Sequence, residues 1–348
     1  MQEIADDLGL SRITVSLVIN GHAKERKLAD ATVEKVEQYL RDVGYVRSRE
    51  AMALRTGQRT AVGILHCGHL FSHLTQAFNL LTDHFADSES GVEVVVRNAS
   101  GTLNGLKEMV SRGVERLILI YGGPFMIPVR ARDEFLTLAG RLGAVIYNYG
   151  FDWTHDDEEL LSRGISLVGF SRKKVYEQMA RVLKSGGHRR VLLADVPSGS
   201  NILFDQQMIE AIDSHGIEII YPSWPTPKDK DLLKQGIRIG KHIARLQSST
   251  RFSAICFRDD CVAGGAMSSM LKHGISIPHE ISVIGMDGHP LCPIFPIPLA
   301  TFEVPVEEMV SQTIQIISGK CPSAAYKFPC EFQGRESFVK ARKPRMQC

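Results

Sequence analysis

From residue 60 onward, short apolar runs alternate with amphipathic stretches, and this alternation constrains the fold more than any other feature of the chain. The apolar runs are short and bounded by polar or turn residues, which is typical of buried strands. A first set of predicted strands comprises 61–65, 92–96, 116–120 and 145–148, and predicted helices such as 74–85 and 103–112 lie between them. A second set comprises 165–170, 190–194, 217–221, 254–257 and 282–285.

Buried strands that alternate with helices form parallel sheets with helices on both faces. We therefore predict an α/β fold in which two doubly wound parallel-sheet subdomains enclose a crevice. In such sheets, ligands bind outside the carboxyl ends of the strands. This architecture suits an enzyme and a solute-binding protein equally well, so the fold alone does not decide the function.

The N-terminal stretch 3–20 has a different pattern, two short amphipathic segments joined by a turn. Apolar residues recur at helical spacing before Gly9, which is a turn residue without a Cβ. Ser11 is a good N-cap for a second helix, which leaves Arg12 and Ile13 on its outer side. Two short helices joined in this way form a helix-turn-helix that can lay its second helix in a DNA major groove. A small helical hairpin without a DNA-binding role is the alternative.

A third helix is predicted over 29–43, and with the first two it would close a small apolar core. The predicted core residues are Ile4, Ala5, Leu8, Val15, Val18, Ile19, Val33, Val36, Tyr39 and Leu40. Basic residues cluster at 24–27 and 47–55, where they could meet phosphates or form a solvated face.

The spacing of several N-terminal residues resembles the DNA-binding headpiece of the LacI/GalR family of bacterial transcription regulators. The residues that carry this resemblance are Ser11, Thr14, Val15, Ser16, Asn20, Gly21, Thr32, Val36 and 43–45. The base-contacting residues on the second helix that the resemblance implies are Arg12, Ile13 and Leu17. The phosphate-contacting residues that it implies in the same region are Thr14, Ser16 and Asn20. Arginine suits guanine because its planar fork donates two hydrogen bonds to O6 and N7, whereas isoleucine and leucine offer only apolar contact.

Residues 46–59 occupy the place of the family's hinge helix, which folds on operator DNA. By resemblance, Leu54 is a base-contacting wedge in the minor groove, and Ala51 is a phosphate-contacting residue. An apolar wedge kinks DNA by unstacking a base step. An ordinary buried leucine near a linker is the alternative for Leu54. The chain departs from the family pattern at Arg47 and Met52, where the family has a proline and an arginine.

Composition narrows the class of protein. A chain with 44% hydrophobic and 23% charged residues is ordinary for a soluble globular protein, and a net charge of +2 does not by itself indicate nucleic-acid binding. Seven cysteines without a paired CxxC spacing indicate free thiols in a reducing compartment. No apolar run approaches the roughly 20 residues of a membrane span. We therefore expect a cytoplasmic protein that makes no membrane contact.

Motifs spread along the α/β region resemble the same family. They lie at 187–191, 259–266, 274–287, 298–301 and 335–337. The resemblance implies a helix-turn-helix headpiece followed by a periplasmic-binding-protein-like effector domain. It also implies a homodimer on a palindromic double-stranded DNA operator and a small-molecule effector in the crevice. The implied function is transcriptional regulation, with repression favoured.

The effector-binding residues that we derive from the resemblance are His69, Phe71, Asn148, Phe204, Asp259 and Asp287. Phe204 stands where the family's sugar-binding members carry an arginine, so a guanidinium that would grip sugar hydroxyls or a carboxylate is absent. We therefore expect an effector other than a standard sugar. Phe204 could stack on a ring, or it could fill a pocket that no longer binds anything. Asp260 is expected to fix the loop backbone by hydrogen bonding, and contact with the ligand is the alternative.

The stretch 66–73 contains His66, Cys67, His69 and His73, so a transition-metal site is conceivable. Structural zinc sites usually bring a second ligand pair, and none is evident in the sequence. We favour polar residues that line the mouth of the crevice, and we expect no metal and no cofactor. There is no GxSxG, no P-loop and no GxGxxG after a strand, so we expect no catalytic residue and no enzyme.

We predict six segments along the chain. They are a headpiece at 1–45, a hinge at 46–59, an N-subdomain at 60–160, a C-subdomain at 161–300, a crossover and closing segment at 301–340, and a basic tail at 341–348. The alternative function is a solute-binding protein or small-molecule sensor of the same core fold with a degenerate headpiece. In the favoured reading, effector binding changes the relative orientation of the subdomains and thereby orders or frees the hinge.

Overall fold

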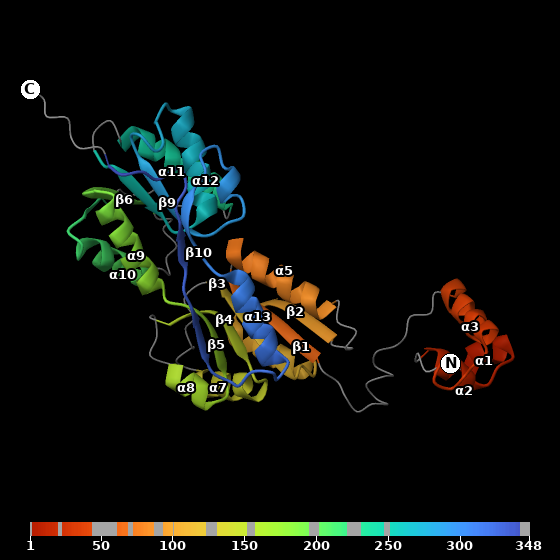
Figure 1. The fold of residues 1–348 in the computed structure, drawn as a ribbon. Helices are drawn as coiled ribbons and strands as arrows, with labels where there is room; N and C mark the ends of the chain where they lie inside the picture. Colours follow the sequence, from red (N-terminus) through yellow and green to blue (C-terminus); the bar gives the residue numbers. More distant parts are fainter. Residues whose placement is uncertain are drawn as a thin grey trace, which may run out of the picture. The chain divides into compact units, whose positions relative to one another are not determined.

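The computed structural model describes most of the chain, and Figure 1 shows its elements. The described residues are 2–19, 23–43, 61–68, 72–86, 93–99, 101–122, 131–151, 157–194, 202–220, 231–246 and 251–341. The chain divides into two compact units, Met1–Arg59 and Thr60–Cys348. Among the described residues, no helix has both the length and the apolar character that a membrane crossing requires.

The described part of the first unit contains three helices, α1 (Gln2–Leu8), α2 (Arg12–Ile19) and α3 (Asp30–Asp42). The turn between α1 and α2 depends on Gly9, whose φ of +64° lies in the left-handed region that glycine adopts without a Cβ clash. Ser11 caps α2 as predicted, because its Oγ accepts a hydrogen bond from the backbone N–H of Thr14 at 3.0 Å.

The helices of the first unit close a small apolar core, as predicted. The buried members of this core are Ile4, Ala5, Leu8, Val15, Val18, Ala23 and Val36, and the partly buried residues packed against them include Ile19, Val33, Tyr39 and Leu40. Lys35 donates a hydrogen bond from Nζ to the carbonyl of Leu8 at 2.9 Å, so α3 also supplies a partner for a carbonyl at the end of α1. With one face of α2 buried in this core, its opposite face points away from the bundle.

The described residues of the second unit form two six-stranded sheets. The first consists of β1 (Ala61–Gly68), β2 (Glu93–Ala99), β3 (Arg116–Gly122), β4 (Val145–Gly150), β5 (Ser166–Phe170) and β11 (Ala325–Phe328), in the order β11-β5-β4-β3-β1-β2. The second consists of β6 (Arg190–Ala194), β7 (Glu218–Ile220), β8 (Ala254–Phe257), β9 (Ser282–Asp287), β10 (Ala300–Glu303) and β12 (Glu331–Gln333), in the order β12-β10-β9-β8-β6-β7. Neighbouring strands are parallel except at the edge of the second sheet, where β12 runs antiparallel to β10.

Helices cover both sheets (Figure 1). Those that belong with the first sheet are α5 (Ser72–Ala86), α6 (Thr102–Ser111), α7 (Arg132–Arg141), α8 (Asp157–Ser162) and α13 (Val306–Ile317). Those that belong with the second are α9 (Arg172–Ser185), α10 (Ile202–Asp213), α11 (Leu232–Leu246), α12 (Asp260–Lys272) and the 3-10 helix η2 (Cys292–Ile294). One buried apolar cluster contains residues of both sheets, for example Ile64 of β1 and Ile284 of β9, so the two halves share a core.

The chain passes between the two sheets three times, from β5 to β6, from β10 to β11 and from β11 to β12. In the second passage, α13 packs against α5 and against β3, β4 and β5 of the first sheet. These passages bring the ends of strands from distant parts of the sequence to the same region. That region is where the architecture predicts a ligand site.

The predicted α/β class with two parallel sheets is confirmed, but one strand was assigned to the wrong set. We predicted 165–170 as the first strand of the second set, whereas β5 pairs with β4 in the first sheet, with Ser166 opposite Val145. An apolar run identifies a strand but not its partner. The partner here follows from the short connection through α8, which returns the chain to the sheet it has just left. The predicted boundary between 160 and 161 therefore precedes a strand of the first sheet.

Candidate functional site

The outer face of α2 carries the residues that sequence reasoning assigned to DNA bases. Arg12 and Ile13 are exposed, and Leu17 is partly exposed. Ile13 has 72% of its surface exposed, which leaves a large apolar side chain in solvent beside a basic one. A single exposed isoleucine is common on protein surfaces. Beside an arginine on an exposed helix face, its apolar side chain can contact a thymine methyl while the arginine binds a neighbouring guanine.

The predicted phosphate contacts are partly within the described residues. Thr14 and Ser16 lie on α2 and are partly exposed, and Thr14 Oγ1 lies 2.8 Å from Ser11 Oγ. The remaining predicted DNA contacts, Asn20, Ala51 and Leu54, lie outside the described residues. The structure therefore groups five of the predicted DNA contacts on one helix, and their contact with DNA stays a prediction.

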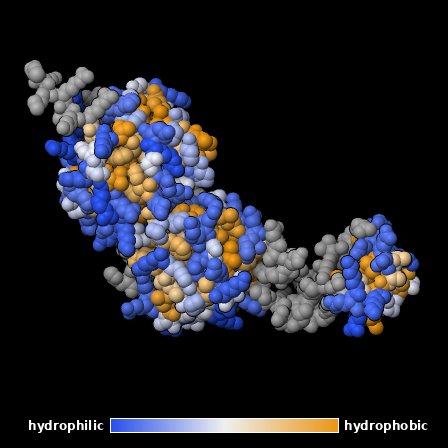
Figure 2. Space-filling model, in the orientation of Figure 1, coloured by the Kyte–Doolittle hydropathy of each residue, from blue (hydrophilic) through white to orange (hydrophobic). Residues whose placement is uncertain are grey.

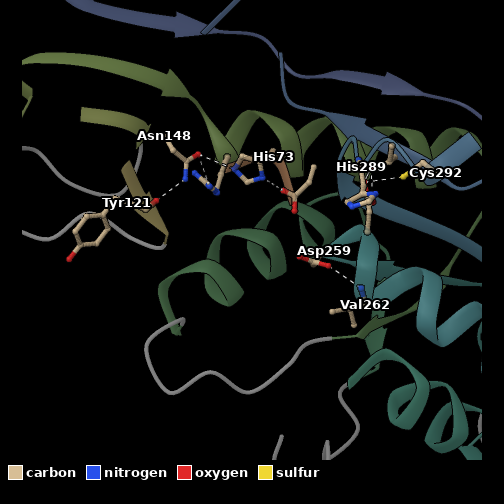
Figure 3. Close-up of polar contacts among 11 residues, drawn as sticks. His73, Tyr121, Asn148, Asp259, Val262, His289 and Cys292 are labelled. Carbon is tan, nitrogen blue, oxygen red and sulfur yellow. Dashed lines mark hydrogen bonds and ion pairs between the residues drawn. The ribbon is translucent and has the colours of Figure 1, made fainter. Parts of the chain in front are cut away.

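A buried polar cluster joins the two sheets of the second unit. His73, in the first turn of α5, has 4% of its surface exposed. Its Nδ1 lies 3.1 Å from Oδ1 of Asp287, the last residue of β9, and its Nε2 lies 3.4 Å from Oδ1 of Asn148 in β4. Figure 3 shows His73 between Asn148 and Asp259. A single imidazole thus contacts strands of both sheets.

The backbone at Asn148 is unusual and fixes its side chain in this cluster. Asn148 has a φ of +66°, and the pairing of β4 with β5 is irregular between Tyr147 and Tyr149. Asparagine tolerates this left-handed conformation better than most residues. Its Nδ2 donates to the carbonyl of Tyr121 at 3.1 Å, and its Oδ1 accepts from Nη2 of Arg172 at 3.3 Å. Asn148 therefore holds β3, α5 and α9 together at one point.

Asp287 and Asp259 place two carboxylates near each other from different elements. Asp287 has a φ of +112°, a strained conformation for a residue with a Cβ. Asp259 is the N-cap of α12, and its Oδ1 accepts a hydrogen bond from the backbone N–H of Val262 at 3.0 Å. Its Oδ2 is buried and has no hydrogen-bond partner among the described residues. Burial, together with the charge of Asp287, raises the pKa of Asp259 to about 7.

Asp260 fixes the following loop, as predicted. Its Oδ2 accepts a hydrogen bond from the backbone N–H of His289 at 2.8 Å, and Thr301 donates to the same carboxyl group at 2.8 Å. Figure 3 shows the neighbouring side chains of His289 and Cys292. Gly285 makes room for this group, because a Cβ there would lie 2.0 Å from Oδ1 of Asp260. Burial, with the charge of Asp287, raises the pKa of Asp260 to about 8.

Sequence reasoning missed Arg172 altogether, and it treated His73 only as one of the polar residues of 66–73 at the mouth of the crevice or in a conceivable metal site. Arg172 is the first residue of α9, and its guanidinium carbon lies 4.4 Å from the centre of the Phe170 ring. Burial lowers the pKa of Arg172, while the charges of Tyr176 and Asp287 raise it. Its position in the sequence could have identified it as a candidate, because Arg172 follows the end of a predicted strand, and ligand sites of parallel sheets lie at such ends.

The other predicted effector contacts are less well placed. His69 and Phe71 lie outside the described residues, and Phe204 lies in α10 with its side chain outside them. In the stretch 66–73, which was considered as a metal site, the His66 ring packs edge-on against Phe78, with ring centres 6.0 Å apart. In the described ranges of the chain, no three histidine, cysteine, aspartate or glutamate side chains are grouped so that they could hold a metal ion.

Two protein families match separate parts of the chain. Residues 1–48 match the family described as bacterial regulatory proteins, lacI family. Residues 180–330 match the family described as periplasmic binding protein-like domain. The first match covers all described helices of the first unit, and the second covers most of the second sheet.

Relatives align along nearly the whole chain. The HTH-type transcriptional repressor PurR of Aliivibrio fischeri is 23% identical over 332 residues, which cover 91% of this chain and 90% of the relative. The HTH-type transcriptional regulator GntR of Pseudomonas aeruginosa is 24% identical over 351 residues, which cover 97% and 95%. A crystal structure of the lac repressor dimer bound to operator and the anti-inducer ONPF matches with a TM-score of 0.67 and 19% identity, and it covers 97% of this chain and 98% of that one.

Proposed function

This chain belongs to the LacI family of bacterial regulatory proteins and is a DNA-binding transcriptional regulator with an effector-binding domain, and we propose which of its residues contact DNA and which contact the effector. The family is not enzymatic. Regulators of this family bind operator DNA as dimers and bind small-molecule effectors. We propose that this protein is a cytoplasmic repressor that binds a palindromic operator as a homodimer.

The DNA contacts that we propose follow the geometry of α2 and, for the hinge segment 46–59, the resemblance to the family. The proposed base-contacting residues are Arg12, Ile13, Leu17 and Leu54, and the proposed phosphate-contacting residues are Thr14, Ser16, Asn20 and Ala51. The exposed pair Arg12 and Ile13 supports this division, because both side chains project from the one face of α2 that the helical core leaves free. A homodimer supplies two such helices, and a palindromic site offers each the same half-site.

The effector site that we propose lies between the two sheets and includes Asn148, Asp259 and Asp287. The proposal extends to His69, Phe71 and Phe204 on the basis of their place in the sequence. The observation that carries it is the buried bridge from Asn148 through His73 to Asp287, which joins the ends of strands in different sheets. A ligand that competes for these groups replaces contacts that hold the two sheets together. It therefore interacts differently with the two arrangements of the sheets, which is what a population shift requires.

The first experiment is selection of bound sequences from a random duplex library at a stated salt concentration. The intact chain is compared with the double variant Arg12→Ala, Leu54→Ala. We expect the intact chain to enrich a palindrome with a central pyrimidine-purine step, which a minor-groove wedge kinks most easily, and the variant to enrich none.

Two outcomes count against the proposal. Enrichment of the same palindrome by the double variant would remove Arg12 and Leu54 from the interface. Failure of the intact chain to enrich any sequence would favour a sensor of the same fold with a degenerate headpiece. A positive selection also identifies the regulated genes, and the substrates of their products nominate candidate effectors for operator-binding assays.

A further inference from the structure

We propose that the ligand bound between the two sheets carries a cationic nitrogen, in an amine or a protonated nitrogen heterocycle, which bridges the carboxylates of Asp259 and Asp287 and displaces His73. This inference rests on the proposed function, because it names the chemical class of the effector for the same site. It follows from three observations: the carboxylates of Asp259 and Asp287 are buried, atoms of this site lack aligned hydrogen-bond partners, and His73 lies beside the carboxylates.

The two carboxylates are buried and close enough to repel each other. Asp259 has 9% and Asp287 has 6% of its surface exposed. After burial, the charge of Asp287 is the largest cause that raises the pKa of Asp259. Two carboxylates that are held together away from water favour a proton or a cation between them. A ligand ammonium would remove the repulsion, whereas a hydroxyl would leave both charges in place.

Atoms in this site have unused hydrogen-bonding capacity. Oδ1 of Asp259 is occupied by the N-cap of α12, but Oδ2 has no partner among the described residues. Nδ1 of His73 lies at ion-pair distance from Asp287, yet it forms no aligned hydrogen bond there. Asp287 therefore has an internal partner with poor geometry. A ligand N–H that points at the carboxylate makes the stronger contact, since charge-assisted hydrogen bonds depend on direction as well as distance.

The side chain beside the carboxylates is itself a nitrogen base. The His73 ring lies edge-on to Phe170 with ring centres 6.4 Å apart, and its charge lowers the pKa of Asp259. The guanidinium of Arg172 donates through Nη2 to Asn148 and lies over Phe170, and Asp287 acts on it electrostatically, so Arg172 offsets part of the charge of Asp287. An ammonium offers three donors and a positive charge, so it has donors for more than one carboxylate oxygen.

The test uses the full chain and matched pairs of small molecules that share a carbon frame. The pairs are phenethylamine with phenethyl alcohol and glucosamine with glucose, and each is measured by thermal unfolding and by calorimetry at neutral pH. We expect the amine of at least one pair to raise the Tm and to bind at least about tenfold more tightly than its alcohol. Asp259→Asn preserves the helix cap, because asparagine caps as well as aspartate, and it should abolish the preference for the amine.

The control variant is Asp213→Asn, which removes an exposed carboxylate on α10 and should leave the preference for the amine unchanged. His73→Ala removes the internal competitor and should tighten amine binding. The inference is overturned if the alcohols bind as tightly as the amines, if no compound shifts the Tm, or if Asp259→Asn retains the preference. Weaker amine binding in His73→Ala would overturn the displacement of His73.

The same samples distinguish this inference from the proposed function. Operator binding is measured by fluorescence anisotropy with and without the amine that binds. If the amine binds through Asp259 and operator affinity does not change, the ligand class stands and effector control of DNA binding fails. If operator selection succeeds and no amine preference is found, the regulator stands and the ligand class fails.

Discussion

His73 Nδ1 lies 3.1 Å from Asp287 Oδ1, and this contact joins the start of α5 on the first sheet to the end of β9 in the second. Both side chains are buried, so water competes little for the contact. The face of the second unit that Figure 2 shows is largely polar, with apolar residues among the polar ones. Under the proposed function, a ligand that takes Asp287 would break this contact between the sheets, so ligand binding and sheet orientation would depend on the same atoms.

The contact between His73 and Asp287 should show measurable energetic coupling. A double-mutant cycle with His73→Ala and Asp287→Asn, measured by urea unfolding, is expected to give a coupling energy of about 1–3 kcal/mol. The comparison cycle uses Lys107 and Glu134, which lie 2.8 Å apart but are each about half exposed, and it should give less than about 1 kcal/mol. Equal coupling in both cycles would contradict a structural role for the buried contact.

Asp259 should make stability depend on pH. Burial, together with the charge of Asp287, raises its pKa from 3.8 to about 7, so the folded chain keeps a proton that the unfolded chain loses. The stability that this proton contributes is fully present below the unfolded pKa and is lost as the pH rises through about 7. As the pH rises from about 5 to about 8, the free energy of unfolding of Asp259→Asn should therefore increase by on the order of 1–3 kcal/mol relative to that of the unaltered chain. Thermal unfolding across this range checks it, and a relative loss for the variant would refute the pKa shift.

Arg12 should contribute specificity as well as affinity. On the operator obtained by selection, Arg12→Ala is expected to cost about 1–3 kcal/mol and to relax the preference at one base pair in each half-site. Arg141→Ala removes an exposed arginine of α7 and should leave operator affinity unchanged. Anisotropy titrations on a set of single-base operator variants make the measurement. A uniform loss across all of these operators would instead assign Arg12 to a phosphate.

Gly285 should be intolerant of even one added carbon. A Cβ at this position would lie 2.0 Å from Oδ1 of Asp260, which holds the loop that begins at His289. We expect Gly285→Ala to destabilise the chain by about 1–3 kcal/mol in thermal unfolding. Gly101→Ala is the control, because no atom lies within 4 Å of the added Cβ and the backbone there is extended. Comparable Tm values for the two variants would show that Asp260 can move without cost.

The helices of the first unit and most strands of the second could be predicted from the sequence, because their signals are local. Ser11 caps α2 by a contact within one helical turn, and the apolar stripe of α3 depends only on the helical repeat. The resemblance to a regulator family rested on residues at fixed local spacing, and the family matches confirmed it. That Asp260 fixes a loop was predicted, but its partners were not, because it bonds His289 and Thr301, which are far from it in the sequence.

The sheet that contains β5 and the composition of the polar cluster were decided by tertiary structure. His73 and Asp287 are far apart in the sequence, and they meet only because the chain passes between the sheets. The residue types at Asn148 and Asp287 allow a positive φ but do not predict it, and contacts with other elements hold the backbone in that conformation. Local periodicity therefore determined which segments are strands and helices. The pairing of those segments, and the burial of charged groups at their ends, determined which side chains form the site.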